Sequence, residues 1–307
     1  AMRWLQRCKA LCAGSQRMFS GKALAVEPDF SKGQRLLVDL RVAELIVAKA
    51  GVRKTDTVFE VGPGAGVLTS PLLRRADKVI AVEIDKRMIG ALEKSLQARS
   101  GADKLEVMYG NVLRQEQFPA FNVLVANLPY QISTDFVLKL VDHRLDFRVA
   151  VVMFQKEFVA RLVARPRTKH YGALAAAVQL FMEVEHFADV GRNSFMPPPR
   201  VDSAVVAFTP RRQRPDVESS EWIAFLKACF RSRNKTLGAL FKQSSVHGRL
   251  ATNAALDIPA TVQRVLGECN ATTLRPNMMH AEDFLLVLQH LHSAGMTFTR
   301  RRSAKRG

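Results

Sequence analysis

The sequence predicts an α/β protein with a doubly wound, mostly parallel sheet, followed by a small helical domain. Two observations carry this prediction. Short apolar segments rich in β-branched residues alternate with helical patterns between residues 36 and 163. After a stretch rich in Pro and Arg at 210–215, the pattern is helical throughout. With 307 residues, 48% of them hydrophobic, the chain is long enough for two domains with buried cores.

The expected elements of the first domain follow one another along the chain. Helices are expected at 36–50, 68–75, 86–98, 133–142 and 154–163. Parallel strands are expected at 57–61, 78–82, 104–109, 121–126 and 147–153. Two late strands, at 178–188 and 203–209, are expected to form an antiparallel edge pair. The second domain is expected to contain helices at 219–230, 233–243, 259–268 and 281–292.

A glycine-rich turn follows the first expected strand. The run EVGPGAG occupies residues 60–66, between an apolar strand and a helical segment. Glycines at such a turn let the backbone approach a ligand closely. The next strand ends in Glu83-Ile84-Asp85, where a carboxylate can accept both hydroxyls of a ribose. This combination alone fits NAD enzymes and enzymes that use S-adenosylmethionine (SAM) equally well.

The most informative stretch is Asn127-Leu128-Pro129-Tyr130, at the exit of an expected buried strand. The Asn side-chain oxygen and a nearby backbone carbonyl can accept the two N–H bonds of the exocyclic amine of a flat base. Pro129 has no N–H and stiffens the turn, and Tyr130 offers a ring face for stacking. An ordinary strand-to-loop turn is the alternative interpretation. Together with the Glu before the first glycine, this stretch favours SAM and an amine acceptor.

Several further motifs, in order, carry a resemblance to a known family. They are MFQKEF at 153–158, FMPPPRVDS at 195–203, FRSRNKTL at 230–237 and AGMTF at 294–298. From about Phe30 to Phe298 the chain resembles the KsgA family of ribosomal RNA adenine dimethyltransferases, most of all its eukaryotic branch. The resemblance implies a Rossmann-like SAM-dependent methyltransferase domain at 28–210, a helical C-terminal domain at 211–299, and basic extensions at 1–27 and 300–307.

The resemblance also implies the residues of the site. Asn127, Leu128 and Pro129 are expected to hold the target amine, and Tyr130 and Phe195 to sandwich the flipped base. The residues expected to bind the cofactor are Gln34, Arg35, Leu37, Glu60, Gly62, Gly64, Gly66, Glu83, Ile84, Asn111, Val112 and Asn127. The expected product of SAM is S-adenosylhomocysteine (SAH). No Cys/His set has metal-ligand spacing in the sequence, so no metal is expected.

Two positions depart from the family pattern. The opening Gly-Gln-His/Asn of the family reads Gly33-Gln34-Arg35 here, without the Pro that usually follows. The Gly-Asp-x-Leu of the family begins with Gly110-Asn111 here. In the family, that Asp accepts a hydrogen bond from the adenine amine of the cofactor. Because Asn keeps an acceptor oxygen but lacks the charge, we expect a lower cofactor affinity than in relatives.

The chain is strongly basic, which indicates a polyanionic partner. Its formal net charge is +18 and its pI is about 10.3. Residues 1–27 carry +4 of this charge and residues 300–307 carry +5, so the remaining body is basic too. The RNA-binding candidates are Arg161, Arg165, Arg200, Arg231, Arg233 and Lys235. A solvated surface residue is the alternative for each single charge.

The N-terminal residues point to a compartment. Residues 2–26 contain several Arg, no acid and intermittent apolar positions, a composition typical of a mitochondrial transit peptide. A basic RNA-binding or nuclear-import arm, in a nucleolar protein, is the alternative. The four scattered cysteines are expected to be free thiols in a reducing compartment. No apolar run of the sequence reads as a membrane span, so no membrane partner is expected.

The predicted function is SAM-dependent dimethylation of adenine exocyclic amines in small-subunit ribosomal RNA, with a role in small-subunit biogenesis. The expected partner is this RNA in a pre-ribosomal particle, and the expected state is a monomer. The alternative is a mitochondrial transcription factor of the same family that binds nucleic acid and polymerase. Arg35 and Asn111 leave it open, whereas the intact 127–130 stretch argues against it. The eukaryotic-like C-terminal half argues against a large-subunit RNA methyltransferase.

Overall fold

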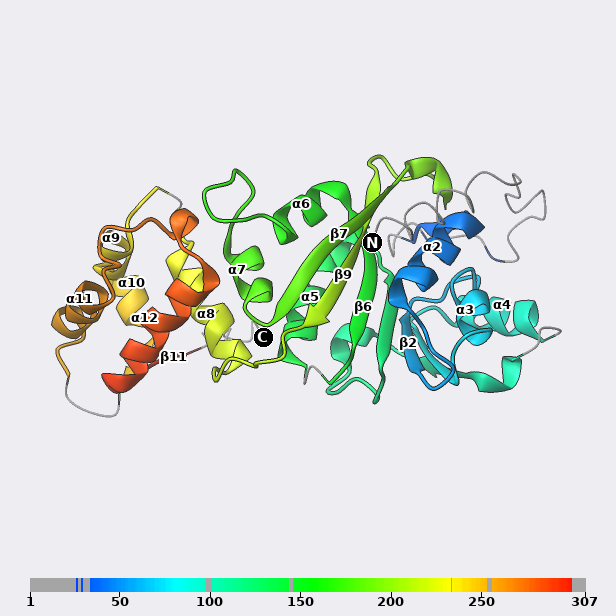
Figure 1. The fold of residues 1–307 in the computed structure, drawn as a ribbon, viewed down its shortest axis with the longest axis horizontal. Helices are drawn as coiled ribbons and strands as arrows, with labels where there is room; N and C mark the ends of the chain where they lie inside the picture. The colour runs from blue at the N-terminus through cyan, green and yellow to red at the C-terminus, as the bar shows by residue number, and fades with distance from the viewer. Residues whose placement is uncertain are drawn as a thin grey trace, which may run out of the picture. The chain divides into compact units, whose positions relative to one another are not determined.

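The computed structural model describes Val26, Asp29 and residues 34–97, 101–143, 146–232, 234–252 and 256–299. Apart from Val26, the expected extensions at 1–27 and 300–307 lie outside the described residues, and so does Arg233. The described chain forms two compact units (Figure 1). The first contains the residues up to Val159 and Glu183–Pro210, and the second contains Ala160–Met182 and the residues from Arg211 onward.

The first unit is built on a seven-stranded sheet in the order β4-β3-β2-β5-β6-β9-β7. Its strands are β2 (Thr57–Val61), β3 (Lys78–Glu83), β4 (Leu105–Tyr109), β5 (Val123–Asn127), β6 (Val149–Gln155), β7 (Met182–Val190) and β9 (Ser203–Pro210). The strands from β4 to β6 run parallel, and β9 pairs antiparallel with β6. The doubly wound, mostly parallel sheet is therefore confirmed.

Helices cover both faces of this sheet. The helices α2 (Leu40–Ala50), α3 (Thr69–Leu73) and α4 (Lys86–Leu96) share one core with Val58 and Val125 of the strands. In Figure 1 these three helices lie together beside β2. On the other face, α5 (Ser133–Asp142) packs Phe136 against Phe118. The winding direction reverses between β2 and β5, and such a switch point is where α/β sheets bind ligands.

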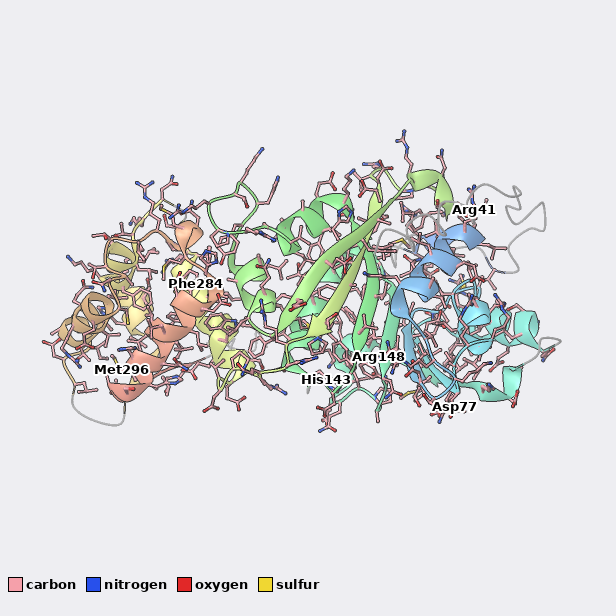
Figure 2. All side chains as sticks on the ribbon, in the orientation of Figure 1. Arg41, Asp77, His143, Arg148, Phe284 and Met296 are labelled. Atoms are coloured by element: carbon pink, nitrogen blue, oxygen red, sulfur yellow. The ribbon has the colours of Figure 1, made fainter. Side chains whose placement is uncertain are left out.

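Local interactions define the two ends of α2. Asp39 caps its start, because the Asp39 side chain accepts a hydrogen bond from the backbone N–H of Arg41. The helix ends at Gly51, whose φ of 56° is the left-handed conformation that suits glycine. Arg148, just before β6, donates to the Gly51 carbonyl and pairs with Asp56 at 2.5 Å. Arg41 and Arg148 therefore lie at opposite ends of this helix (Figure 2).

A short ladder changes the start of the first helix. The two-residue strands β1 (Leu36–Leu37) and β8 (Phe195–Met196) pair antiparallel, and Leu37 lies opposite Phe195. The helix expected from residue 36 therefore begins at Leu40. The sequence pattern did not reveal this ladder, because the two strands are short and far apart in the chain.

The second unit is mostly helical. It contains α7 (Ala173–Gln179), α8 (Ser219–Cys229), α9 (Leu237–Phe241), α10 (Ser244–His247), α11 (Ile258–Glu268) and α12 (Ala281–Ser293), and the end of α6 (Lys156–Leu162) from Ala160 onward. A small antiparallel sheet joins β10 (Leu250–Thr252) to β11 (Met296–Phe298). The core of this second unit holds an aromatic cluster in which Phe284 (Figure 2) contacts Phe225 and Phe230.

Residues 160–182 differ from the expectation in two ways. Ala173–Gln179 forms the helix α7, whereas no helix was expected there and a strand was expected from residue 178. The indole N–H of Trp222 donates to the Ala177 carbonyl at 3.3 Å, so α7 packs on α8. The segment therefore groups with the helical unit, although it lies inside the expected boundaries 28–210 of the methyltransferase domain.

Candidate cofactor and base-binding site

A pocket of about 230 Å³ lies in the first unit, where β2, β3 and β5 end. The sequence predicted many of the residues that line it: Gln34, Arg35, Gly62, Gly64, Glu83, Ile84, Asn111, Val112, Asn127, Leu128 and Pro129. Parallel strands bring these residues together, because their carboxyl ends meet at one edge of the sheet. The remaining wall is largely apolar and includes Leu36, Val61, Val82, Met88 and Ile132, which the motifs did not single out although each lies close to one.

The glycine turn forms one wall of the pocket. Gly62 and Gly64 have φ values of 69° and 54°, which side chains with a Cβ rarely adopt. A Cβ at Gly64 would lie 3.1 Å from the Leu36 side chain. The turn therefore gives a ligand access to the backbone. Gly66, with a φ of 84°, is not in the wall: a Cβ there would lie 2.8 Å from Leu92 of α4, so this glycine serves packing.

Glu83 connects the end of β3 to the glycine turn. Its carboxylate accepts hydrogen bonds from the backbone N–H groups of Gly64 at 3.3 Å, Ile84 at 2.9 Å and Asp85 at 3.0 Å. Burial raises the pKa of this carboxyl group, and the backbone hydrogen bonds oppose that rise. Gln34 joins the same network by donating to Asp85 at 3.2 Å. A carboxylate held in this way is a suitable acceptor for ribose hydroxyls.

The side chain of Asn127 has a defined orientation. Its Nδ2 donates to the backbone carbonyl of Arg35 at 3.1 Å. The amide oxygen of Asn127 is therefore left as the acceptor at the pocket wall. Leu128, buried, and Pro129 follow it in the same wall. The Asn127 amide oxygen is therefore free of this bond on the side of the pocket, and its role toward an amine stays a prediction.

Tyr130 is held by the motif at residues 195–203. Its hydroxyl lies 2.8 Å from the Ser203 hydroxyl at the start of β9. Burial raises the pKa of Tyr130, while the Ser203 hydrogen bond and the positive charge of Arg35 lower it. The side chain is half-buried and tied at its polar end. Two motifs that are far apart in the sequence therefore meet beside the pocket.

Phe195 and Leu37 lie elsewhere than predicted. Phe195 is only 2% exposed and Leu37 only 5%, and both belong to the core between the sheet and α2. A ring buried to this extent cannot stack on a base, so the expected sandwich with Tyr130 is absent from this structure. The cause is the β1–β8 ladder, which turns Phe195 and Leu37 inward and leaves Leu36 in the pocket wall.

Glu60 is also buried rather than in the pocket wall. Its side chain has no exposed surface, and neither carboxyl oxygen has a hydrogen-bond partner among the described residues. Burial raises the pKa of Glu60 to about 8, opposed by the Thr69 hydroxyl and assisted by the nearby charge of Glu83. At neutral pH this carboxyl group is therefore largely protonated.

The predicted RNA-binding side chains are exposed where the structure describes them. Arg200 belongs to the first unit, and Arg161, Arg165, Arg231 and Lys235 belong to the second. The Arg231 guanidinium donates to the Ser245 hydroxyl. The segment 231–235 does not open a helix as expected, because α9 begins at Leu237 after its cap Thr236.

Two further findings concern the described part of the chain. No group of three or more His, Cys, Asp or Glu side chains is arranged there to hold a metal ion. None of its helices combines the length and apolar character needed to cross a membrane.

The sequence matches the family model described as "Ribosomal RNA adenine dimethylase" over residues 28–271. The chain belongs to this family. It is accordingly a SAM-dependent methyltransferase that dimethylates adenine in ribosomal RNA.

Relatives agree with this assignment. The chain is 40% identical over 279 residues to "Dimethyladenosine transferase" of Schizosaccharomyces pombe, covering 87% of this chain and 91% of the relative. It is 46% identical over 213 residues to "Ribosomal RNA small subunit methyltransferase, mitochondrial" of Arabidopsis thaliana, covering 69% of this chain and 56% of that protein. The crystal structure of a dimethyladenosine transferase from Plasmodium falciparum superposes with a TM-score of 0.80 at 34% identity, covering 86% of this chain and 100% of that one. These names do not favour the transcription-factor alternative.

Proposed function

We propose that this adenine dimethyltransferase acts on small-subunit ribosomal RNA and binds both SAM and the target adenine at the pocket between β2, β3 and β5. The observation that supports this most is the Asn127 amide, which the Arg35 carbonyl orients beside the glycine turn. An acceptor for an amine thus lies next to a glycine turn that lines the same pocket.

The pocket residues fit the cofactor. We assign the ribose hydroxyls to Glu83, the adenine to Asn111 and Val112 with their apolar neighbours, and the methionine part to the backbone of Gly62 and Gly64. When bound, SAM would supply the electrophilic methyl group, and SAH would be left once the nitrogen–carbon bond has formed and the sulfur–carbon bond has broken. The protein then has to place the amine on the line of that transfer.

The chain contributes positioning rather than a base. The Asn127 Oδ1 and the Leu128 carbonyl accept the two N–H bonds of the adenine amine, which favours a pyramidal nitrogen with its lone pair towards the methyl group. Among the described residues of the pocket wall there is no His or Lys, and the Glu83 carboxylate already accepts three N–H bonds. The nitrogen carries a positive charge once it has accepted the methyl group, and this cation is strongly acidic, so its proton passes to water.

The target base has to leave its stack before it reaches this pocket. Unstacking costs a few kcal/mol, less in a loop. Stacking on an aromatic ring returns about 1–3 kcal/mol. Tyr130, which Ser203 holds at its hydroxyl, is the ring we assign to this task.

Electrostatic contacts would hold the rest of the RNA. The exposed side chains of Arg161, Arg165, Arg200, Arg231 and Lys235 suit phosphate contacts, which position RNA without reading its sequence. We assign the substrate to a pre-ribosomal particle. We also place the protein in mitochondria, which the composition of residues 2–26 supports, with the nucleolus as the alternative.

The test is methyl transfer from labelled SAM to small ribosomal subunits that lack the modification. Digested RNA is analysed for dimethyladenosine with the wild type, Asn127→Ala and Asn122→Ala. Asn122 is a matched control, because it lies just before the same strand and its side chain only accepts from Thr57 N–H at 2.8 Å. We expect product from the wild type and Asn122→Ala, and a loss of about 10²–10³-fold with Asn127→Ala. Equal rates for both variants would refute the role of Asn127, and no wild-type product would refute this substrate.

A further inference from the structure

A carboxyl group without a partner is buried behind the proposed cofactor pocket. Glu60 of β2 has no exposed surface, and both of its oxygens lack a hydrogen-bond partner among the described residues. Burying such a group uncompensated is costly, and native proteins rarely leave one in this state without a reason. The mechanism above makes no use of it.

The surroundings of Glu60 come from the elements packed against β2. Its strand neighbours are Ala81 of β3 and Val125 of β5, which carry no charge. The buried Thr69 hydroxyl of α3 is the polar group that faces Glu60, and its hydrogen bonding lowers the pKa of this carboxyl group. Glu83, at the end of β3, adds a negative charge nearby.

These surroundings locate the carboxyl group behind the glycine turn. The Glu83 side chain accepts from the Gly64 N–H, and the Thr69 hydroxyl lies 3.9 Å from the position of a Cβ at Gly66. The two residues that follow Glu60 on the chain, Val61 and Gly62, line the pocket. The carboxyl group therefore belongs to the residue that directly precedes the pocket wall, and it lies near the side chains that hold the turn.

The two forms of the cofactor differ in charge. SAM carries a sulfonium and an ammonium cation against one carboxylate, whereas SAH has lost the sulfonium charge. A cation in a poorly solvated site favours the ionised form of a nearby carboxyl group. The pKa of Glu60, raised to about 8 by burial and Glu83, keeps the group protonated at neutral pH until such a cation arrives.

We propose that Glu60 senses the charge of the bound cofactor: it releases its proton to solvent when SAM binds and takes a proton back when SAH occupies the pocket. One proton thus leaves for each SAM bound and returns for each methyl group transferred. Since dimethylation consumes two SAM molecules, SAH has to be replaced between the transfers, and Glu60 favours that replacement. The proposal rests on the assignment of this pocket to the cofactor.

The test counts protons rather than product. Titration calorimetry at pH 6.5–7 in two buffers of different ionisation enthalpy gives the protons exchanged per ligand bound. For the wild type we expect a release of about 0.5–1 proton with SAM and close to none with SAH. Sinefungin, which has an ammonium in place of the sulfonium, should resemble SAM. In Glu60→Gln the difference between the ligands should vanish, and the preference for SAM over SAH should fall about 3–10-fold.

Asp56→Asn is the matched control, because Asp56 is a buried carboxylate just before β2 but pairs with Arg148 away from the pocket. It should keep the wild-type proton count. Equal proton release with SAM and SAH in the wild type would overturn the proposal, and that comparison needs no variant to fold. Proton release that persists in Glu60→Gln would overturn it as well. A wild type that binds no SAM would instead refute the assignment of the pocket, and this proposal with it.

Discussion

The side-chain amide of Asn127 donates a hydrogen bond to the backbone carbonyl of Arg35, with 3.1 Å between the two atoms and 92 positions between the residues. Because the acceptor belongs to the backbone, the bond does not depend on the side chain at position 35. This explains how Arg can stand where the family has His or Asn. Arg at position 35 is therefore compatible with the Asn127 hydrogen bond, although the sequence alone suggested that it lowers activity.

Asn127→Asp tests this relationship directly. The carboxylate would place an oxygen opposite the Arg35 carbonyl, so a donor is lost and two acceptors face each other. We expect a loss of stability of about 1–3 kcal/mol and a fall in the methylation rate of at least about 10²-fold. Denaturant unfolding and single-turnover methylation measure the two effects.

Arg35→Ala is the companion to that variant. The variant leaves the carbonyl in place, so we expect its methylation rate to stay within about threefold of the wild type. A change of this size corresponds to less free energy than one hydrogen bond contributes. A loss in Arg35→Ala as large as in Asn127→Asp would show that the side chain of Arg35, and not its carbonyl, matters.

Asn111→Asp should strengthen cofactor binding. The Asn111 side-chain oxygen accepts from the Leu113 N–H at 2.9 Å, so the other atom that it offers is the amide Nδ2, a donor. A carboxylate keeps the Leu113 contact and adds a second acceptor for the adenine amine. We expect the SAM dissociation constant to fall about 3–10-fold, consistent with one hydrogen bond to a charged group.

Calorimetric titration with SAM checks this prediction. Asn122→Asp is the control, because it makes the same change outside the pocket wall, where the side chain accepts from Thr57. Weaker SAM binding in Asn111→Asp than in the wild type would contradict the proposed position of the adenine.

The features of the fold that the sequence predicts are those that depend on residues close together in the chain. The strands and the 60–66 and 127–130 turns depend on local patterns and on the shared edge of a parallel sheet, and the structure places both turns at one pocket. The inward orientation of Leu37 and Phe195 depends on one pair of residues far apart in the chain, which no periodicity reveals. The helix α7 was missed although alanine favours helices, because its short, largely buried run shows no helical periodicity and leads almost directly into β7.

Two glycines near α4 should respond to alanine in opposite ways. At Gly66 a Cβ would meet Leu92 at 2.8 Å and would have to adopt a φ of 84°, so we expect a loss of about 1–3 kcal/mol. At Gly90, inside α4, nothing lies within 4 Å of an added Cβ, so we expect a gain of about 0.5–1 kcal/mol. Chemical denaturation measures both, and equal effects would contradict the assigned packing role of Gly66.

The titration of Glu60 should make stability fall as pH rises. In the unfolded chain this group has its ordinary pKa of 4.5, and in the folded protein burial and Glu83 raise the pKa to about 8. Between these values the folded state holds a proton that the unfolded state has lost. The free energy of unfolding therefore decreases from about pH 5 to pH 8 and levels off above.

Scanning calorimetry from pH 6 to pH 9 tests this dependence. We expect the unfolding midpoint of the wild type to fall more steeply with pH than that of Glu60→Gln, which cannot ionise. Parallel curves for the two proteins would show that another group governs the slope. Asp56→Asn again serves as the buried-carboxylate control.

The β1–β8 ladder links the position of the Phe195 ring to the position of Leu36 in the pocket wall. It pairs Leu36 with Met196 and Leu37 with Phe195, two residues on each side. Its opening would expose the Phe195 ring, and the same event would withdraw Leu36 from the cofactor wall. One two-residue ladder thus holds Leu36 in the cofactor wall and the Phe195 ring in the core, so a single pair of short strands fixes both positions.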